Sequence, residues 1–242
     1  MLDIKNLTKS FGGVQAVRGS TFRIEEKKIT ALIGPNGAGK TTIFDMVSGL
    51  LKSDSGEIVF NRTVLNRLPA YARANLGVSR TFQQVRLFTY LTILDHLRMI
   101  EDNTDMQWWC EIFRSQRADR TKYQAMLDEF GIKRDLDTPV SDLSYGQRKL
   151  LDLAMALKRP HKLLMLDEPV AGVNSVIQEQ IEQLLLRLKK AGETVFLIDH
   201  DMEFVRHLAD HVIVLDAGVV LTEGAPEVVL RDPRVLEAYL GA

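Results

Sequence analysis

The stretch Gly34–Thr42 constrains the fold of this chain more than any other part of the sequence. It reads Gly-Pro-Asn-Gly-Ala-Gly-Lys-Thr-Thr and matches the pattern G-x-x-x-x-G-K-[ST]. The preceding residues 29–33 are apolar or β-branched and predict a buried strand. Residues 41–49 carry apolar side chains at near-helical spacing and end on a glycine, which predicts a helix. A glycine-rich loop between a strand and a helix is the context in which this motif binds phosphate.

Each residue type in the loop has a physical reason to be there. The glycines let backbone N–H groups converge on phosphate oxygens, and the following helix adds the positive end of its dipole. Lys40 is expected to reach the β- and γ-phosphates, and the Thr41 hydroxyl is expected to bind Mg²⁺. The predicted nucleotide-binding set is Gly34, Pro35, Asn36, Gly37, Ala38, Gly39, Lys40, Thr41 and Thr42. A chance glycine-rich turn is the alternative, and the flanking strand and helix argue against it.

Composition narrows the class of protein. A chain of 242 residues with 45% hydrophobic and 26% charged residues suits one large globular domain or two small lobes. A net charge of -1 argues against a general attraction to nucleic acid or anionic lipid. Cys110 is the only cysteine, which excludes an internal disulfide and fits a reducing compartment. No apolar run approaches the ~20 residues that span a bilayer, and the N-terminal residues show no signal-peptide pattern. A membrane role is therefore expected to act from the cytoplasm, through a partner.

Apolar strands alternate with helices along the chain. Strands are predicted at 2–7, 21–24, 29–33, 55–60, 162–169 and 194–200, with a hairpin at 211–221. Helices are predicted at 41–49, 70–75, 91–101 and 122–130, from 144 to about 158, at 177–192, and at 227–240 with an interruption near Pro233. Residues 80–88 are expected to be irregular. Such alternation implies a mostly parallel sheet that binds ligands at the carboxyl ends of its strands.

Polar residues follow several of these strands. Asp167 has the position of a carboxylate that holds Mg²⁺, and Glu168 that of a base for an attacking water; a solvated acidic pair is the alternative. Gln83, in the irregular segment, is suited to reach metal and lytic water. His200 is a candidate donor to the γ-phosphate, or a structural histidine. Phe11 is placed to stack on adenine or to pack on the sheet.

Five segments together resemble a known family: GPNGAGKTT, TFQQ, LSYGQ, LLMLDEP and LIDHD, in that order. The set is similar to the nucleotide-binding subunit of an ATP-binding cassette (ABC) transporter and covers essentially the whole chain. The resemblance implies an α/β fold, a P-loop NTPase core with a mainly parallel sheet and an N-terminal antiparallel β subdomain. A helical subdomain is expected to be inserted at about residues 90–158 of a single nucleotide-binding domain, residues 1–242.

The resemblance also implies roles for individual residues. Leu143–Gln147 corresponds to the signature motif, whose Ser144, Tyr145, Gly146 and Gln147 bind the γ-phosphate held by an opposite subunit. Phe11 becomes the adenine stack, Glu168 the catalytic base and His200 the switch histidine. Gln83 becomes the Q-loop residue and, with Thr41 and Asp167, a ligand of Mg²⁺. One chain then holds half of each site, so two chains must close around two ATP molecules.

Within the family, several segments resemble ATPases of bacterial branched-chain amino acid importers. They are TFQQVRLF at 81–88, LSYGQ at 143–147, AGVN at 171–174, DHDM at 199–202 and AYLG at 238–241. Importers of urea or short amides share much of this pattern, exporters of lipid or polysaccharide are a further alternative, and a non-transport cassette is disfavoured. Tyr145 replaces a common glycine, and Asn174 stands where most cassettes carry the D-loop aspartate. The helical insert is shorter than expected for the subgroup.

The implied partners are a second ABC ATPase subunit, the same or a related chain, and transmembrane permease subunits. A substrate-binding protein is implied indirectly, and nucleic acid is not. The expected location is the cytoplasmic face of the inner membrane, as a peripheral subunit. Val85, Leu87, Phe88 and Leu91 are apolar candidates for docking the permease, with internal packing as the alternative.

Overall fold

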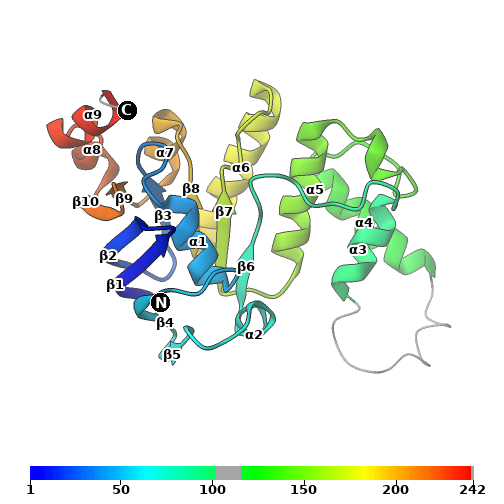
Figure 1. Ribbon diagram of the computed structural model, residues 1–242. Helices are drawn as coiled ribbons and strands as arrows, with labels where there is room; N and C mark the ends of the chain where they lie inside the picture. The colour runs from blue at the N-terminus through cyan, green and yellow to red at the C-terminus, as the bar shows by residue number, and fades with distance from the viewer. Residues whose placement is uncertain (102–115, 241–242) are drawn as a thin grey trace. The chain divides into compact units, whose positions relative to one another are not determined.

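The computed structural model describes residues 1–101 and 116–240. Trp108, Trp109, Cys110 and Gly241, the last residue of the AYLG segment, lie outside these ranges. Figure 1 shows the order of the elements. The strands are β1 (Leu2–Phe11), β2 (Val14–Ile24), β3 (Ile29–Ile33), β4 (Ser55–Phe60), β5 (Thr63–Val64), β6 (Val78–Arg80), β7 (Leu163–Asp167), β8 (Val195–Ile198), β9 (His211–Asp216) and β10 (Val219–Gly224). The α-helices are α1 (Lys40–Ser48), α2 (Ala70–Asn75), α3 (Ile93–Glu101), α4 (Gln116–Glu129), α5 (Tyr145–Lys158), α6 (Ser175–Ala191), α7 (Met202–Leu208), α8 (Pro226–Val229) and α9 (Pro233–Leu240).

The N-terminal strands form a four-stranded antiparallel sheet in the order β2-β1-β4-β5. Residues Leu2 and Ile4 of β1 alternate with more exposed neighbours, so one face of the sheet is apolar and buried. Leu2 pairs with Ile24 of β2, and the hairpin turns at residues 12 and 13. The predicted antiparallel β subdomain is confirmed, although both of its first strands run longer than the sequence pattern indicated.

The second sheet has six strands in the order β10-β9-β3-β8-β7-β6. Its strands pair in parallel except for β10, which is antiparallel to β9. Every residue of β3, β7 and β8 is buried, which explains their unbroken apolar runs. The mainly parallel sheet is therefore confirmed. The prediction that residues 80–88 are irregular is wrong at Arg80, because residues 78–80 form the edge strand β6. A strand of only three residues is too short to be recognised from a sequence pattern.

Helix α1 contributes to a core that both sheets share. Its Ile43 and Phe44 are fully buried and belong to one apolar cluster with Leu2 of β1 and Leu32 of β3. The ring of Phe44 lies 4.6 Å, centroid to centroid, from the ring of Phe196 on β8. This packing fixes the start of α1, and hence the loop before it, against the carboxyl end of β3.

Helix α2 supports α1 from its other end. The buried guanidinium of Arg73, on α2, donates hydrogen bonds to the carbonyl oxygens of Met46 and Val47 at the end of α1. Last-turn carbonyls have no partner inside their own helix, so Arg73 satisfies groups that burial would otherwise leave unpaired. Helix α7, which follows its N-cap Asp201, was not predicted because its apolar pattern spans barely two turns.

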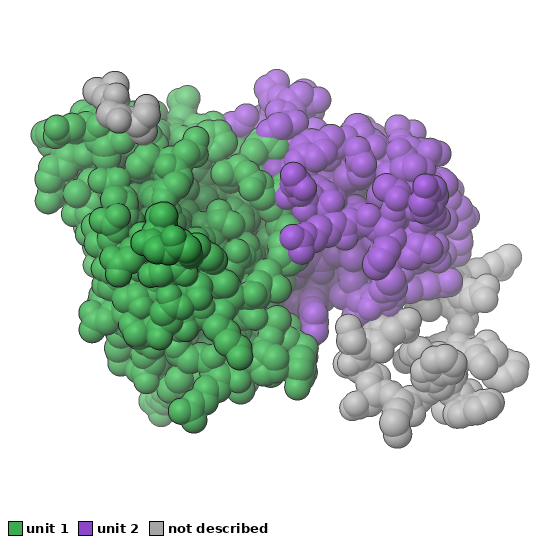
Figure 2. Space-filling model, viewed as in Figure 1, with its two compact units in different colours: residues 1–83, 161–171, 185–242 green, residues 84–160, 172–184 purple. Residues whose placement is uncertain are grey.

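The chain divides into two compact units, coloured separately in Figure 2. Unit 1 comprises residues 1–83, 161–171 and 185–242 and holds both sheets. Unit 2 comprises residues 84–160 and 172–184 and is mainly helical. Buried side chains of unit 2, such as Leu97, Tyr123 and Leu151, come from α3, α4 and α5, and each of these helices contacts the other two.

Candidate functional site

The loop after β3 closes on itself through its lysine. Lys40 Nζ donates hydrogen bonds to the carbonyl oxygens of Gly34, at 2.6 Å, and Pro35, at 2.9 Å. The side chain is buried, and burial lowers the pKa of Lys40, while the negative charges of Glu168 and Asp167 oppose that shift. A lysine held by two neutral carbonyls can exchange them for phosphate oxygens without first breaking an ion pair.

Two glycines of this loop are required by close packing. Gly34 has φ +148°, and a Cβ there would lie 1.9 Å from the carbonyl oxygen of Leu215. At Gly39, with φ +99°, a Cβ would lie 2.4 Å from the carbonyl oxygen of Ala16. No other residue fits either position without moving the neighbouring backbone. The loop is also hydrogen-bonded from outside: Gly218, between β9 and β10, donates to the carbonyl oxygen of Ala38 at 3.1 Å.

The acidic pair lies at the end of β7 and is joined to Gln83. Gln83 Nε2 donates to Glu168 Oε2 at 2.8 Å, although the two residues are 85 positions apart in the chain. Glu168 has φ +47°, in the left-handed region that a non-glycine residue adopts at a cost of about 1 kcal/mol or more. Its backbone N–H is fixed by the carbonyl oxygen of Ile198 on β8. The structure thus brings together two of the predicted site residues in a strained turn.

Arg80 is a site residue that the sequence did not reveal. Its side chain is 6% exposed, and its Nη2 lies 3.1 Å from Asp167 Oδ2. Its Nη1 donates to Asp45 Oδ1 at 2.7 Å and to Ser48 Oγ at 2.8 Å, both on α1. Burial raises the pKa of the Asp167 carboxyl, and the guanidinium of Arg80 limits that rise. Asp45 and Asp167 are 35 and 87 residues away from Arg80, so no local sequence pattern indicates these contacts.

The residues predicted to hold Mg²⁺ are of the kinds that bind this ion together with a nucleotide. Within residues 1–101 and 116–240, no group of three or more His, Cys, Asp or Glu side chains is arranged to hold a metal alone. Mg²⁺ usually keeps several waters and takes one or two carboxylates plus substrate phosphates. Asp167, the amide oxygen of Gln83 and the hydroxyl of Thr41 offer that kind of partial, all-oxygen ligation.

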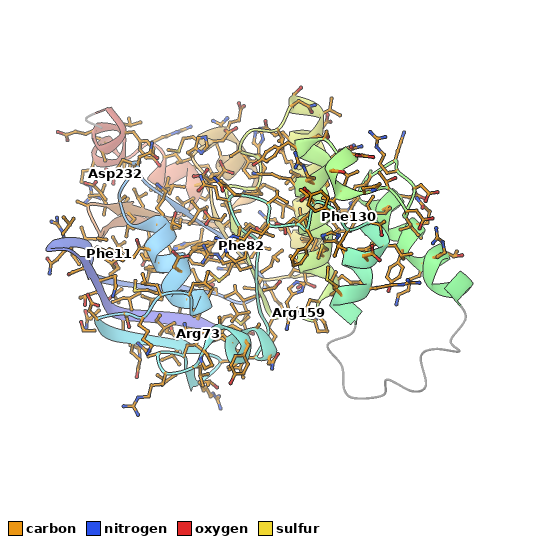
Figure 3. The ribbon with its side chains drawn as sticks, turned by 45° about the vertical axis from the view of Figure 1, so that its right-hand side comes forward. Phe11, Arg73, Phe82, Phe130, Arg159 and Asp232 are labelled. Carbon is orange, nitrogen blue, oxygen red and sulfur yellow. The ribbon has the colours of Figure 1, made fainter. Side chains whose placement is uncertain are left out.

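His200 and Phe11 present their rings to the surface. The imidazole of His200 is 63% exposed, and its Nδ1 lies 3.9 Å from Oδ1 of Asp199. Asp199 is fully buried, its Oδ1 accepts from the backbone N–H groups of His200 and Asp201, and burial raises the pKa of its carboxyl. Phe11, labelled in Figure 3 on β1, is 49% exposed, with Lys9 Nζ 5.6 Å from its ring centroid. Neither ring is packed in the interior.

The signature segment belongs to unit 2 and is organised at the start of α5. Ser144 is the N-cap: its Oγ accepts from the N–H of Gln147 at 3.2 Å, and its own N–H donates to Gln147 Oε1 at 3.1 Å. A Cβ on Gly146 would lie 2.9 Å from Cγ1 of Ile177, so this glycine allows α5 to approach α6. Lys149 Nζ lies 5.7 Å from the ring centroid of Tyr145.

Asn174 has a structural role that an aspartate would share. Its Oδ1 accepts from the N–H of Ile177 at 3.0 Å and so caps the start of α6. Among the candidates for docking a partner, Phe88 and Leu91 are exposed, and Val85 and Leu87 are partly buried. Internal packing therefore accounts for Val85 and Leu87 in part, but not for Phe88 and Leu91.

Comparison with known proteins gives matches along the whole chain. The family model described as "ABC transporter" matches residues 17–171, and the one described as "Branched-chain amino acid ATP-binding cassette transporter" matches residues 219–242. The chain is 34% identical to the high-affinity branched-chain amino acid transport ATP-binding protein BraF of Pseudomonas aeruginosa, over 100% of this chain and 98% of BraF.

Solved structures agree with the sequence matches. A nucleotide-free ATP-binding cassette from an ABC transporter superposes with a TM-score of 0.86 at 28% identity and covers 100% of this chain and 99% of its own. A dimeric cassette in a post-hydrolysis state bound to ADP and Pi superposes with a TM-score of 0.80 at 26% identity, over 93% of this chain and 99% of its own. Within the described ranges, no helix is long and apolar enough to cross a bilayer.

Proposed function

The chain belongs to the ABC transporter family, and on that premise we propose that it is the ATP-hydrolysing subunit of an amino acid importer. The observation that carries the proposal is the hydrogen bond between Gln83 and Glu168, next to Asp167 at the end of β7. Glu168 lies in a left-handed turn, and Gln83 binds its carboxylate. A carboxylate positioned in this way is suited to orient a water molecule toward a γ-phosphate.

Hydrolysis is proposed to depend mainly on positioning and charge. Lys40 gives up the carbonyls of Gly34 and Pro35 and binds β- and γ-phosphate oxygens. Thr41, Gln83 and Asp167 would hold Mg²⁺, and the ion would neutralise phosphate charge when it is bound with ATP. Glu168 accepts a proton from the attacking water, and the exposed His200 donates to the γ-phosphate. Phe11 stacks on adenine with the face that Lys9 does not cover.

Two chains are proposed to complete each site. The start of α5 carries the exposed Ser144 and the buried Gly146, whose donors would reach the γ-phosphate held by the loop of a partner subunit. Support comes from the helix N-terminus at Ser144 and from the dimeric, ADP-bound cassette to which this chain is similar. ATP then closes the dimer, and hydrolysis reopens it.

The proposed substrate class is branched-chain or other hydrophobic amino acids. It rests on the name of BraF and on the C-terminal match at residues 219–242. The chain would work at the cytoplasmic face of the membrane with permease subunits and, through them, a substrate-binding protein. Exposed Phe88 and Leu91 are candidates for the permease contact.

Replacement of the proposed base tests the reaction. We expect Glu168→Gln to bind MgATP but to lose hydrolysis by ~10²-fold or more, the usual contribution of a positioned base. It should also accumulate as an ATP-bound dimer in light-scattering measurements. The matched control is Glu26→Gln, an exposed carboxylate outside the site, which should keep wild-type turnover. Near-normal hydrolysis by Glu168→Gln would overturn the assignment of the base.

Reconstitution tests the substrate class. The chain should co-purify with hydrophobic permease subunits, and leucine, isoleucine or valine with a binding protein should stimulate its hydrolysis in liposomes. Urea or lysine serves as the control solute. Stimulation by urea alone would contradict the amino acid assignment while leaving the ATPase intact.

A further inference from the structure

The C-terminal helix α9 is connected to the phosphate loop by a hydrogen bond. The backbone N–H of Gly34 donates to the hydroxyl oxygen of Tyr239 at 2.6 Å, across 205 positions of sequence. Both residues belong to unit 1. Burial raises the pKa of Tyr239 to about 12, so the hydroxyl stays neutral near pH 7.

The peptide groups flanking Gly34 are held from two sides. Its N–H is bound by Tyr239, and its carbonyl oxygen accepts from Lys40 Nζ. Gly34 is buried and has no side chain to fix its orientation, so these two contacts restrict rotation about the residue. Loss of the hydroxyl would leave a buried N–H without its acceptor, which the loop can relieve only by moving.

Helix α9 borders a cavity near this contact. Val235 is buried, but Leu236 is 52% exposed. Tyr239 and Leu236 line a cavity of about 540 Å³, together with Leu230, Met202, Arg206 and His200. The Tyr239 hydroxyl is therefore a directional contact to the loop at the edge of this cavity.

We propose that Tyr239 is a positioning residue for the phosphate loop: it holds the Gly34 peptide so that the loop is preformed for ATP. The inference deepens the proposed function and rests on it. It gives the segment after β10, which matches the branched-chain family model, a part in setting the affinity for ATP. If the loop is in its binding-competent form for only a fraction of the time, the apparent affinity for ATP falls in proportion to that fraction.

The test replaces the hydroxyl and keeps the ring. For Tyr239→Phe we expect the KM for ATP to rise about 3- to 10-fold while kcat stays within about 2-fold, because bound ATP restores the loop. The amide of Gly34 should exchange its hydrogen faster, by NMR, while the amide of Leu32 in β3 stays protected. Tyr71→Phe, at an exposed tyrosine of α2, and Leu236→Ala, on α9 itself, should both keep the wild-type KM.

The outcomes separate this inference from the proposed function. An unchanged KM and unchanged Gly34 exchange in Tyr239→Phe would overturn the positioning role and leave the ATPase assignment standing. A lower unfolding midpoint with wild-type KM would also overturn it, because that result describes packing alone. A wild-type chain that does not bind ATP would overturn both.

Discussion

The phosphate loop and the signature segment are built in opposite ways. Residues 34–42 are held by distant elements: Tyr239 on α9 binds Gly34, and Gly218 binds Ala38. The signature segment instead satisfies its own backbone, because Ser144 and Gln147 bond each other at the start of α5. The first region is held by residues far away in the sequence, and the second by its own first helix turn and a neighbouring helix.

This difference predicts that damage to distant contacts will affect the two regions unequally. Changes to buried contacts of unit 1, such as those of Arg80, should lower the free energy of unfolding of the whole unit. Changes at the signature segment should cost less stability than changes at the buried supports of unit 1, and they should have larger effects on hydrolysis if a partner subunit uses the segment.

The largest effect is expected from Arg80→Met. This change leaves the carboxylates of Asp167 and Asp45 without their guanidinium, and breaking such a buried pair costs about 3 kcal/mol of unfolding free energy. Urea denaturation without nucleotide measures it. The double variant Arg80→Met/Asp167→Asn should recover much of the loss, since it also removes the buried charge. Equal losses in both variants would contradict an electrostatic role.

The same variant should respond to pH in a defined direction. Without Arg80, the folded-state pKa of Asp167, already raised by burial, should rise further. The native chain then binds a proton that the unfolded chain releases, so lowering the pH toward the folded pKa favours the native state. The loss of stability in Arg80→Met should therefore shrink as pH falls from neutral. A loss that grows on acidification would contradict this sign.

A smaller effect is expected from Gly146→Ala. The added Cβ would meet Cγ1 of Ile177, a stiff β-branched side chain, and overpacking of this kind costs about 1–3 kcal/mol. Adding Ile177→Ala makes room, so the two changes should be less than additive in unfolding free energy. Strict additivity would show that α5 and α6 do not meet at this point.

The smallest effect on stability is expected at Ser144. Ser144→Ala removes an N-cap and should cost about 1 kcal/mol, whereas Ser144→Asn keeps a capping oxygen and should be nearly neutral. If the hydroxyl also contacts a partner's ATP, both variants should hydrolyse ATP slowly despite their different stabilities. Parallel changes in stability and turnover would limit Ser144 to capping.

These contrasts also explain what could be predicted from sequence. Ser144 as a cap follows from serine three residues before Gln147, and the strand, loop and helix around Lys40 follow from local spacing. Arg80 and Tyr239 could not be found this way, because their partners lie 87 and 205 positions away. Gly34 was assigned to phosphate binding, yet its contact with Leu215 requires a glycine even without phosphate.

The family resemblance predicted the sheets and the family correctly, and the roles of the site residues stay predictions. The geometry within unit 1 supports the roles predicted for Gln83 and Glu168, because these two side chains are hydrogen-bonded. Glu168 has an unusual backbone conformation, and its N–H is held by β8, which is a tertiary contact that propensity does not encode.

One structure determination tests the central claim of shared sites most directly: that of the Glu168→Gln variant with MgATP. We predict a dimer in which the Ser144 hydroxyl of each protomer lies within about 3.5 Å of the γ-phosphate bound by its partner's Lys40 loop. A complex in which Ser144 is remote from every bound nucleotide would contradict it.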